Sequence, residues 1–321
     1  MSKFRGILIF FVLVVFVACG SEGGNGQDSY VPSGEGVPLM WHVTSPSGRT
    51  MYLFGSIHAA DSRAYPLPDF VMDAFNRSDY LAVEVDLTAM PPLEDLLAIN
   101  ELMMAGPGRS IIDYIGFELH ARAVRLMDRY RPAGWMPMTA NGFGPAVWMS
   151  GLLSIVIEAS GLTAEEGIDM FFINEANAMG MPILEAESML SQMAMLAGFS
   201  PPLMLAVIED AVIAAENLDE AAAQMLEMYD AWLRGDAEWM LALNAAGDYA
   251  FEMLGLDSTY IHEYNYGFLI ARDREMTEVA RGWMADGKQV FFVAGLFHFL
   301  HDYSIVHLLT QAGYDVQLVR P

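Results

Sequence analysis

The sequence predicts an α/β protein with a mixed central sheet assembled from both ends of the chain and a large α-helical insertion or lid. Two Gly-x-x-His motifs, at 55–58 and 295–298, each close an apolar, strand-like run. A strand that ends in glycine, with a histidine three residues on, places an imidazole at the carboxyl edge of a sheet. Ligands bind at that edge in open α/β folds, so the two motifs predict one shared site.

The first 18 residues have the pattern of a bacterial lipoprotein signal peptide. Lys3 and Arg5 precede an apolar run of 12 residues at 7–18, which is signal-peptide length and shorter than the roughly 20 residues of a membrane span. The run ends at Cys19, the only cysteine, as in a lipobox. We therefore expect export and lipidation of Cys19, which would anchor the protein to a membrane of the cell envelope. An ordinary secretory signal with an incidental cysteine is the alternative.

Composition sets further bounds on the mature chain. Residues 19–37 are rich in glycine and polar residues and are expected to form a flexible tether. The remaining segment, 38–321, is long enough for one large domain. The full sequence has a formal net charge of −25, which disfavours nucleic acid as a partner. A single cysteine excludes an internal disulfide framework.

The N-terminal part of this domain alternates strand and helix patterns. Strands at 41–44 and 50–54 flank the hairpin-like turn 45–48. Asp69 is the expected N-cap of a short helix that runs through Phe75. A third strand, at 80–86, is apolar until Glu84 and Asp86, which the pleat places on one face near its end.

Two long blocks are predicted to be helical, around 91–177 and 200–256. In the second block Gly235 is expected to end one helix and Asp236 to cap the next. We interpret this block as a cap or lobe over the sheet.

The strands that complete the sheet come from later in the chain. A strand at 181–187 carries Glu187 at its end. The last unit consists of a strand at 289–294, the loop with His298, a helix to Ala312 and a strand at 314–319. The sheet therefore needs both ends of the chain.

Four groups at predicted strand ends carry the chemistry: His58, Glu84, Glu187 and His298. Two neutral imidazoles with one or two carboxylates make a ligand shell for a divalent transition metal. Water bound to such a metal ionises near neutral pH, and one carboxylate can act as general base. The alternative is a set of buried polar groups that brace the loops.

Several other polar residues keep two interpretations. Arg272 can fix a carboxylate or a substrate anion through bidentate bonds, or form a surface ion pair. His301 either supports the site from behind or begins the next helix. Asp86 and Glu185 share strand faces with Glu84 and Glu187, and their roles stay open. A serine nucleophile elbow and a phosphate-binding glycine loop are absent from the sequence.

These motifs, in this order, resemble those of the TraB/GumN family, whose eukaryotic relatives include the Tiki membrane proteases. The matching stretches lie at 52–58, 65–68, 83–86, 167–169, 182–188 with Gln192, Arg272, 293–298, 308–309 and 313–314. Together they cover nearly all of the chain after Trp41.

The resemblance implies an α/β core of the EreA/ChaN/Tiki-like kind with a helical lid, and a metal-dependent hydrolase site. In the Tiki branch the activity is that of a metalloprotease that uses manganese or cobalt-like ions. Carried over residue by residue, His58, Glu84, Glu187 and His298 would bind the metal (Mn, Co or Zn). Glu84, Glu187 and Arg272 would be catalytic, acting on a peptide or small-molecule substrate.

Three positions depart from the family pattern. Asp273 stands where asparagine usually follows the arginine, His301 replaces the glycine that usually follows the second histidine motif, and Ala186 replaces a leucine. The function expected from the sequence is an envelope-anchored, metal-dependent, peptidase-like hydrolase. The alternative is a non-catalytic lipoprotein that binds or sequesters a peptide or signalling ligand.

Overall fold

A computed structural model describes residues 36–132, 135 and 137–320. The predicted signal peptide, Cys19 and nearly all of the predicted tether lie outside the described residues.

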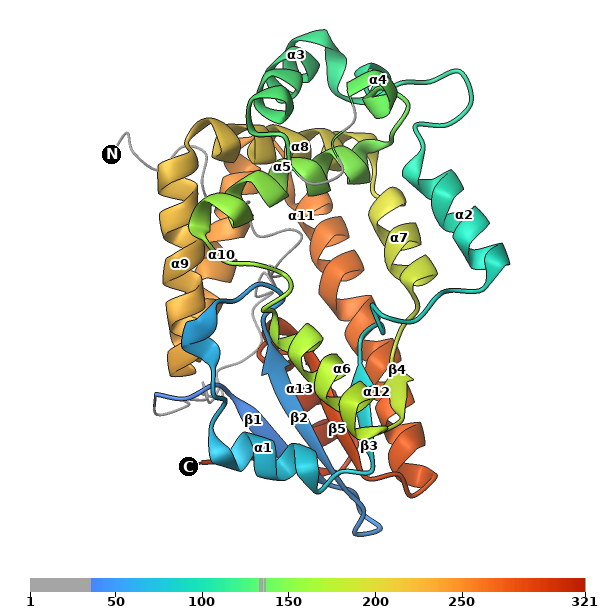
Figure 1. Ribbon diagram of the computed structural model, residues 1–321, viewed down its shortest axis with the longest axis vertical. Coiled ribbons are helices and arrows are strands. Elements are labelled where there is room, and N and C mark those ends of the chain that lie inside the picture. Colours follow the sequence, from blue (N-terminus) through green and yellow to red (C-terminus); the bar gives the residue numbers. More distant parts are fainter. Residues whose placement is uncertain (1–35, 133–134, 136, 321) are drawn as a thin grey trace.

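The core is a six-stranded mixed sheet with the strand order β4-β3-β5-β2-β1-β6 (Figure 1). The strands β4, β3, β5 and β2 run parallel to one another, whereas β1 is antiparallel to both β2 and β6. The strands are β1 (Met40–Thr44), β2 (Thr50–Ser56), β3 (Tyr80–Val83), β4 (Ile183–Glu185), β5 (Val290–Gly295) and β6 (Asp315–Leu318). The N-terminal strands pair directly with the C-terminal strands, which confirms the predicted fold class.

Helices cover both faces of the sheet. Successive side chains of strand β5 point to opposite faces, and all of its residues are buried. Phe291 packs against Phe75 and Phe172 on one face. Its neighbour Phe292 packs edge-on against Trp283 and Phe299 on the other face. The elements involved are α1 (Asp69–Asn76) and α6 (Ile168–Met179) on the first face, and α12 (Ala271–Ala285), the 3-10 turn η3 (Leu296–Phe299) and α13 (Ile305–Gln311) near the second.

The remaining helices gather beyond the carboxyl ends of the parallel strands and form a helical lobe (Figure 1). Trp232 ties the lobe to the sheet, because its indole Nε1 donates to the carbonyl of Gly55 over 2.9 Å. The lobe comprises α2 (Leu93–Met103), α3 (Ile112–Tyr130), α4 (Pro137–Ala140), α5 (Pro145–Ser160), α7 (Met189–Ala197), α8 (Pro201–Glu216), α9 (Leu218–Arg234), α10 (Ala237–Met253) and α11 (Ser258–Asn265). The short turn η1 (Ser62–Ala64) precedes α1, and the π-helical turn η2 (Tyr266–Ile270) joins α11 to α12.

Local signals in the sequence fix some boundaries and miss others. Helix α9 ends at Gly235, which has φ of 62°, and the side chain of Asp236 then caps α10, as predicted. The prediction that Asp69 caps α1 is wrong. Pro68 occupies the N-cap position, and Asp69 is the first helical residue, where its charge still favours the helix N-terminus.

The strand predicted at 181–187 is shorter than expected, spanning only Ile183–Glu185. Its pairing with β3 nevertheless continues in irregular form. The amide of Ala186 donates to the carbonyl of Val83, and that of Glu187 donates to the carbonyl of Glu84. The two glutamates therefore leave the sheet side by side.

Among the described residues, no single helix is long and apolar enough to cross a membrane. The consecutive helices α7 and α8 reach that length and composition only together, with a bend of 99° between them.

Candidate functional site

The four residues singled out at predicted strand ends all follow the carboxyl ends of the parallel strands. Along the edge, in the order β4, β3, β5, β2, they are Glu187, Glu84, His298 and His58. In the register between β2 and β5, Ser56 lies opposite Gly295, so the two Gly-x-x-His motifs sit on neighbouring strands. Residues 240 positions apart in the chain are thereby brought to one place.

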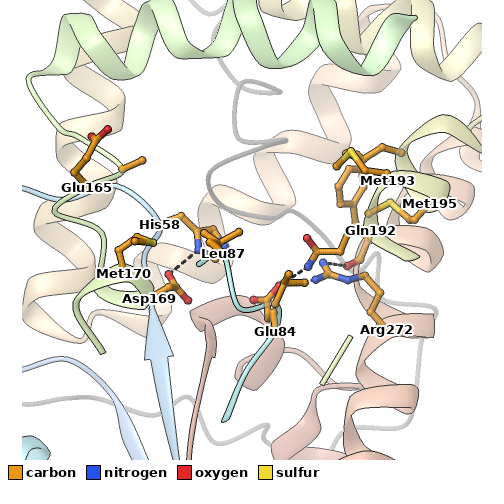
Figure 2. A pocket seen from close by; sticks show the side chains of 14 residues that line it. His58, Glu84, Leu87, Glu165, Asp169, Met170, Gln192, Met193, Met195 and Arg272 are labelled. Atoms are coloured by element: carbon orange, nitrogen blue, oxygen red, sulfur yellow. Dashed lines mark hydrogen bonds and ion pairs between the residues drawn. The ribbon is translucent and has the colours of Figure 1, made fainter. Parts of the chain in front are cut away.

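A pocket of about 410 Å³ opens at this edge, between the sheet and the helical lobe. Figure 2 shows His58 with Asp169 on one side of it, Glu84 in the middle, and Arg272 with Gln192 on the other side. The rest of the wall is largely apolar. It is lined by Val85, Leu87, Ala164, Glu165, Met170, Met193, Met195, Leu196 and Phe268.

His58 is held by Asp169, the second residue of α6. Nδ1 of His58 lies 2.7 Å from Oδ2 of Asp169, and the hydroxyl of Ser56 donates to Oδ1 of the same carboxylate over 2.8 Å. The backbone brings α6 close, because the amide of Ile168 donates to the carbonyl of Ile57. A Cβ at Gly167 would lie 2.3 Å from the carbonyl oxygen of His58, so this approach requires glycine.

The pairing changes the protonation of His58. Burial disfavours the charged imidazolium, but the adjacent Asp169 carboxylate outweighs burial and raises the pKa of His58 to about 9. The side chain keeps 29% of its surface exposed, and it lines the pocket. In the absence of a ligand, His58 is therefore an imidazolium at neutral pH.

Arg272 joins the two strand-end glutamates. Its Nη2 lies 2.6 Å from Oε2 of Glu84 and 2.7 Å from Oε2 of Glu187, and its Nε donates to Oε1 of Glu187 over 2.8 Å. Gln192 also donates to both carboxylates, and the backbone amide of Gly295 donates to Oε1 of Glu84. Each oxygen of the two glutamates therefore accepts a hydrogen bond.

The network keeps Glu84 and Arg272 charged although both are nearly buried. Burial alone would raise the pKa of Glu84, but Arg272, His298 and His58 together hold it well below its usual range. Burial would lower the pKa of Arg272, and the two glutamates raise it further instead. The π-helical turn η2 contributes as well, because Nη1 of Arg272 donates to the carbonyl of Phe268.

His298 lies behind Glu84 and is fully buried. Its Nε2 is 3.7 Å from Oε1 of Glu84, and its Nδ1 forms a short hydrogen bond with Asp273. Asp273 is also fully buried, and its second oxygen lies 2.6 Å from Nε2 of His301. Asp273 and His301, the two departures from the family pattern near this motif, are therefore in direct contact.

The two motif histidines thus share an arrangement. Each has an aspartate at Nδ1, Asp169 for His58 and Asp273 for His298, and Glu84 has charge interactions with both imidazoles. The family model for TraB/PrgY/gumN proteins matches residues 39–318, which include every part of this site. The chain belongs to the TraB/PrgY/gumN family.

Two curated relatives are similar to part of this family member. The uncharacterized protein YbaP of Escherichia coli (strain K12) is 27% identical over 172 residues, and that of Shigella flexneri matches to the same extent. The match covers 52% of this chain and 59% of each relative's length. No solved structure gives a significant match.

The donors at this TraB/PrgY/gumN site suit a divalent metal in their chemistry. In histidines that bind metals, the other ring nitrogen is usually hydrogen-bonded to a carboxylate. Nδ1 of His58 and Nδ1 of His298 both have such a partner. Four carboxylates, Glu84, Glu187, Asp169 and Asp273, stand against the guanidinium of Arg272. With His58 neutral, as a metal ligand must be, the formal excess is three negative charges, which a divalent cation would reduce to one.

The side chains do not, however, form a closed ligand set as they stand. Within the described residues, no group of three or more His, Cys, Asp or Glu side chains is placed to hold an ion. Both glutamates accept hydrogen bonds at both oxygens, but Glu84 also has charge interactions with both imidazoles. Glu187 is therefore the least suited of the predicted ligands. His58, Glu84 and His298 are the better candidates.

Sequence reasoning left three functional partners without a role: Asp169, Gln192 and Asp273. Asp169 and Gln192 lie in stretches that match the family, but nothing in the sequence links them to residues more than 100 positions away. Asp273 stood out only as an added charge. Asp86 and Glu185 lie outside the network. The side chain of Glu185 accepts a hydrogen bond from the backbone amide of Asp86, and the side chain of Asp86 accepts one from the backbone amide of Thr88.

Proposed function

We propose that this protein is a metal-dependent hydrolase that acts on peptide-like substrates with apolar side chains. The observation that carries the proposal is the pair of aspartate-bound imidazoles next to Glu84: His58 lines the pocket together with Glu84, and His298 is buried behind Glu84. A ligand-binding protein without chemistry has no need for two imidazoles fixed in this way.

In this proposal His58, Glu84 and His298 hold the metal. When bound, a divalent ion supplies an activated water and polarises the substrate carbonyl. Asp169 orients His58, and Arg272 keeps Glu84 ionised and in place. Glu187 then serves to hold Arg272, and its carboxylate is not required as a ligand.

The walls of the pocket support an apolar substrate. Eight of the lining side chains are apolar, and three of them are methionines, Met170, Met193 and Met195. Methionine is unbranched and adapts to ligands of different shape. On the rim, Leu87 is 56% exposed, which extends the apolar surface outward.

Attachment to the cell envelope is a second part of the proposal, supported by the apolar run before Cys19. Replacing Cys19 by serine should move the protein from the membrane fraction to the soluble fraction and abolish labelling with a radioactive fatty acid. Unchanged labelling of the variant would refute lipidation at Cys19.

Titration calorimetry with Mn²⁺, Co²⁺ and Zn²⁺ tests the metal site. We expect about one ion per chain, and loss of binding in His58→Ala and in His298→Ala. His262→Ala on the exposed surface of α11 is the matched control and should bind normally. Absence of any affinity tighter than millimolar would overturn the metal-dependent mechanism. Cleavage of a peptide library with the metal-loaded protein then tests the hydrolase.

A second candidate function is favoured by one observation. All four oxygens of Glu84 and Glu187 already accept hydrogen bonds, so the network is complete in the ligand-free protein. We therefore keep the non-catalytic alternative, an envelope protein that sequesters an apolar peptide. It predicts that His58→Ala retains peptide binding and that the wild-type protein cleaves nothing.

A further inference from the structure

We infer, building on the proposed function, that Glu165 determines substrate specificity by binding a positively charged group of the peptide, next to the apolar segment that the pocket holds. Glu165 lines the pocket, and its side chain is exposed to solvent. Figure 2 shows it on the same side of the pocket as His58 and Asp169, across from Arg272. Its carboxylate is the feature of the pocket that the proposed chemistry does not use.

The other charged side chains that line the pocket are already paired within the protein. His58 is bound to Asp169, with 2.7 Å between Nδ1 and Oδ2. Arg272 is bound to Glu84, with 2.6 Å between Nη2 and Oε2. Glu165 differs, because its carboxylate forms no hydrogen bond or ion pair with any residue that the structure describes. A charged group of a substrate can therefore pair with Glu165 without breaking a contact inside the protein.

This distribution of charge decides the sign of the group that the pocket accepts. A substrate carboxylate would need a cation from the protein, but His58 and Arg272 are both engaged with carboxylates of the protein itself. An ammonium or guanidinium group instead meets the unpaired carboxylate of Glu165. The formal net charge of −25 also attracts cations toward the molecule as a whole. The pocket therefore favours a peptide with an apolar segment and a positive charge beside Glu165.

The turn that carries Glu165 is fixed on both sides. Before it, Thr163 exchanges two backbone hydrogen bonds with Ala60, in the loop that follows β2. After it, the hydroxyl of Tyr65 donates to the backbone carbonyl of Glu166 over 2.6 Å. Because the backbone is held in this way, a substrate does not have to order the turn when it binds, and this saves conformational entropy.

The exposure of Glu165 sets the size of the expected effect. An ion pair between solvent-exposed groups is weak, because water screens the charges and the side chains lose freedom. We therefore expect the positive charge to raise peptide affinity by about 2- to 5-fold. An effect of this size selects among peptides that already fit the apolar wall of the pocket.

The test measures peptide binding to the metal-free full chain, so that the result does not depend on cleavage. The probes are acetylated octapeptides of alanine, leucine and serine in which one position at a time carries either lysine or N-acetyl-lysine. A second set without lysine has either a free or an acetylated amino terminus, because both sources supply an ammonium group. Mass spectrometry measures the fraction of each peptide that the immobilised protein retains. The wild-type protein should bind the charged member of at least one pair more tightly.

Three variants assign this preference to its cause. Glu165→Gln should bind the charged and uncharged members of each pair equally. Glu166→Gln is the matched control, because it removes the same charge at the neighbouring position, which lies outside the pocket lining, and it should keep the preference. Glu165→Lys should bind the uncharged members more tightly. Because both side chains are exposed, all three variants should unfold at the wild-type temperature.

The position of the preference identifies the charged group: an internal lysine points to a side chain, and a free amino terminus points to the end of the peptide. Equal binding of both members in every pair would overturn the inference, and so would a preference that Glu165→Gln retains. An equal loss in Glu165→Gln and Glu166→Gln would also overturn it, because the overall charge would then be the cause.

Failure of the proposed function would look different. In that case the wild-type protein would still prefer charged peptides, but the protein loaded with Mn²⁺, Co²⁺ or Zn²⁺ would cleave none of them. If the role of Glu165 alone is wrong, the loaded protein would cleave charged and uncharged peptides alike.

Discussion

Replacing Asp169 by asparagine should lower the pKa of His58 from about 9 to below its ordinary value of 6.5. The variant removes the negative charge at 2.7 Å that favours the imidazolium, and it leaves the burial that opposes it. Asparagine is close to aspartate in size, so the packing of α6 on the sheet should change little.

The size of the effect follows from the two pKa values. A difference between 6.5 and about 9 corresponds to about 3 kcal/mol in favour of the charged form. Because the folded-state pKa lies above the unfolded value, this stabilisation is fully present below about pH 6.5. It is lost as the pH rises through about 9. The wild-type protein should therefore lose stability across that range, and Asp169→Asn should not.

The assay is an NMR titration of the histidine ring carbons in the metal-free protein between pH 5 and 10, together with urea unfolding at pH 6 and pH 9. Asp219→Asn, at an exposed position in the first turn of α9, is the control and should leave His58 unchanged. The reasoning is refuted if His58 titrates near 6.5 in the wild type, or if Asp169→Asn leaves its pKa near 9.

Three further predictions concern the same network. Arg272→Met leaves two nearly buried glutamates without their cation and should cost about 3–5 kcal/mol in urea unfolding. The matched change at Arg234, whose pair is exposed, should cost at most about 0.5 kcal/mol, and equal costs would contradict the claimed role of burial. Gly167→Ala must move α6 away from the carbonyl of His58. The variant should lower stability by about 1–3 kcal/mol and lower the pKa of His58. Neither change would occur if Gly167 were not packed this closely against the carbonyl of His58. Because the folded-state pKa of Glu84 is depressed, its stabilisation is lost as the pH falls below about 4.5. Glu84→Gln should reduce this acid sensitivity in thermal unfolding from pH 6 to pH 3. An unchanged dependence of stability on pH would contradict a stabilising role of the ionised Glu84.

The sequence contains enough information to place the strand ends, because the carboxyl ends of parallel strands all lie at the same edge of a sheet. Apolar runs that stop at Ser56, Val83 and Gly295 deliver whatever follows them to one edge. The gathering of His58, Glu84 and His298 therefore follows from pattern and topology. Helix boundaries at Gly235 and Asp236 were predictable for a similar reason, since capping is a local interaction.

The partners of these residues were beyond sequence reasoning. Asp169 reaches His58 because α6 docks closely at Gly167, and this docking depends on tertiary packing. Arg272 had two interpretations, and only the packing of η2 and α12 against the strand ends shows that it bridges both glutamates. Which carboxylate oxygens stay accessible to a metal is likewise a property of the folded network.

The order of strands in the sheet has a consequence for biosynthesis. The strand β5 lies between β2 and β3, so its residues 290–295 must be present before the N-terminal strands acquire their shared neighbour. Contacts between such distant segments form slowly, and they cannot form on a nascent chain that still lacks one partner. The central sheet therefore stays incomplete in a nascent chain that lacks residues 290–295, a property that suits a protein threaded unfolded through a membrane, as proposed here for export.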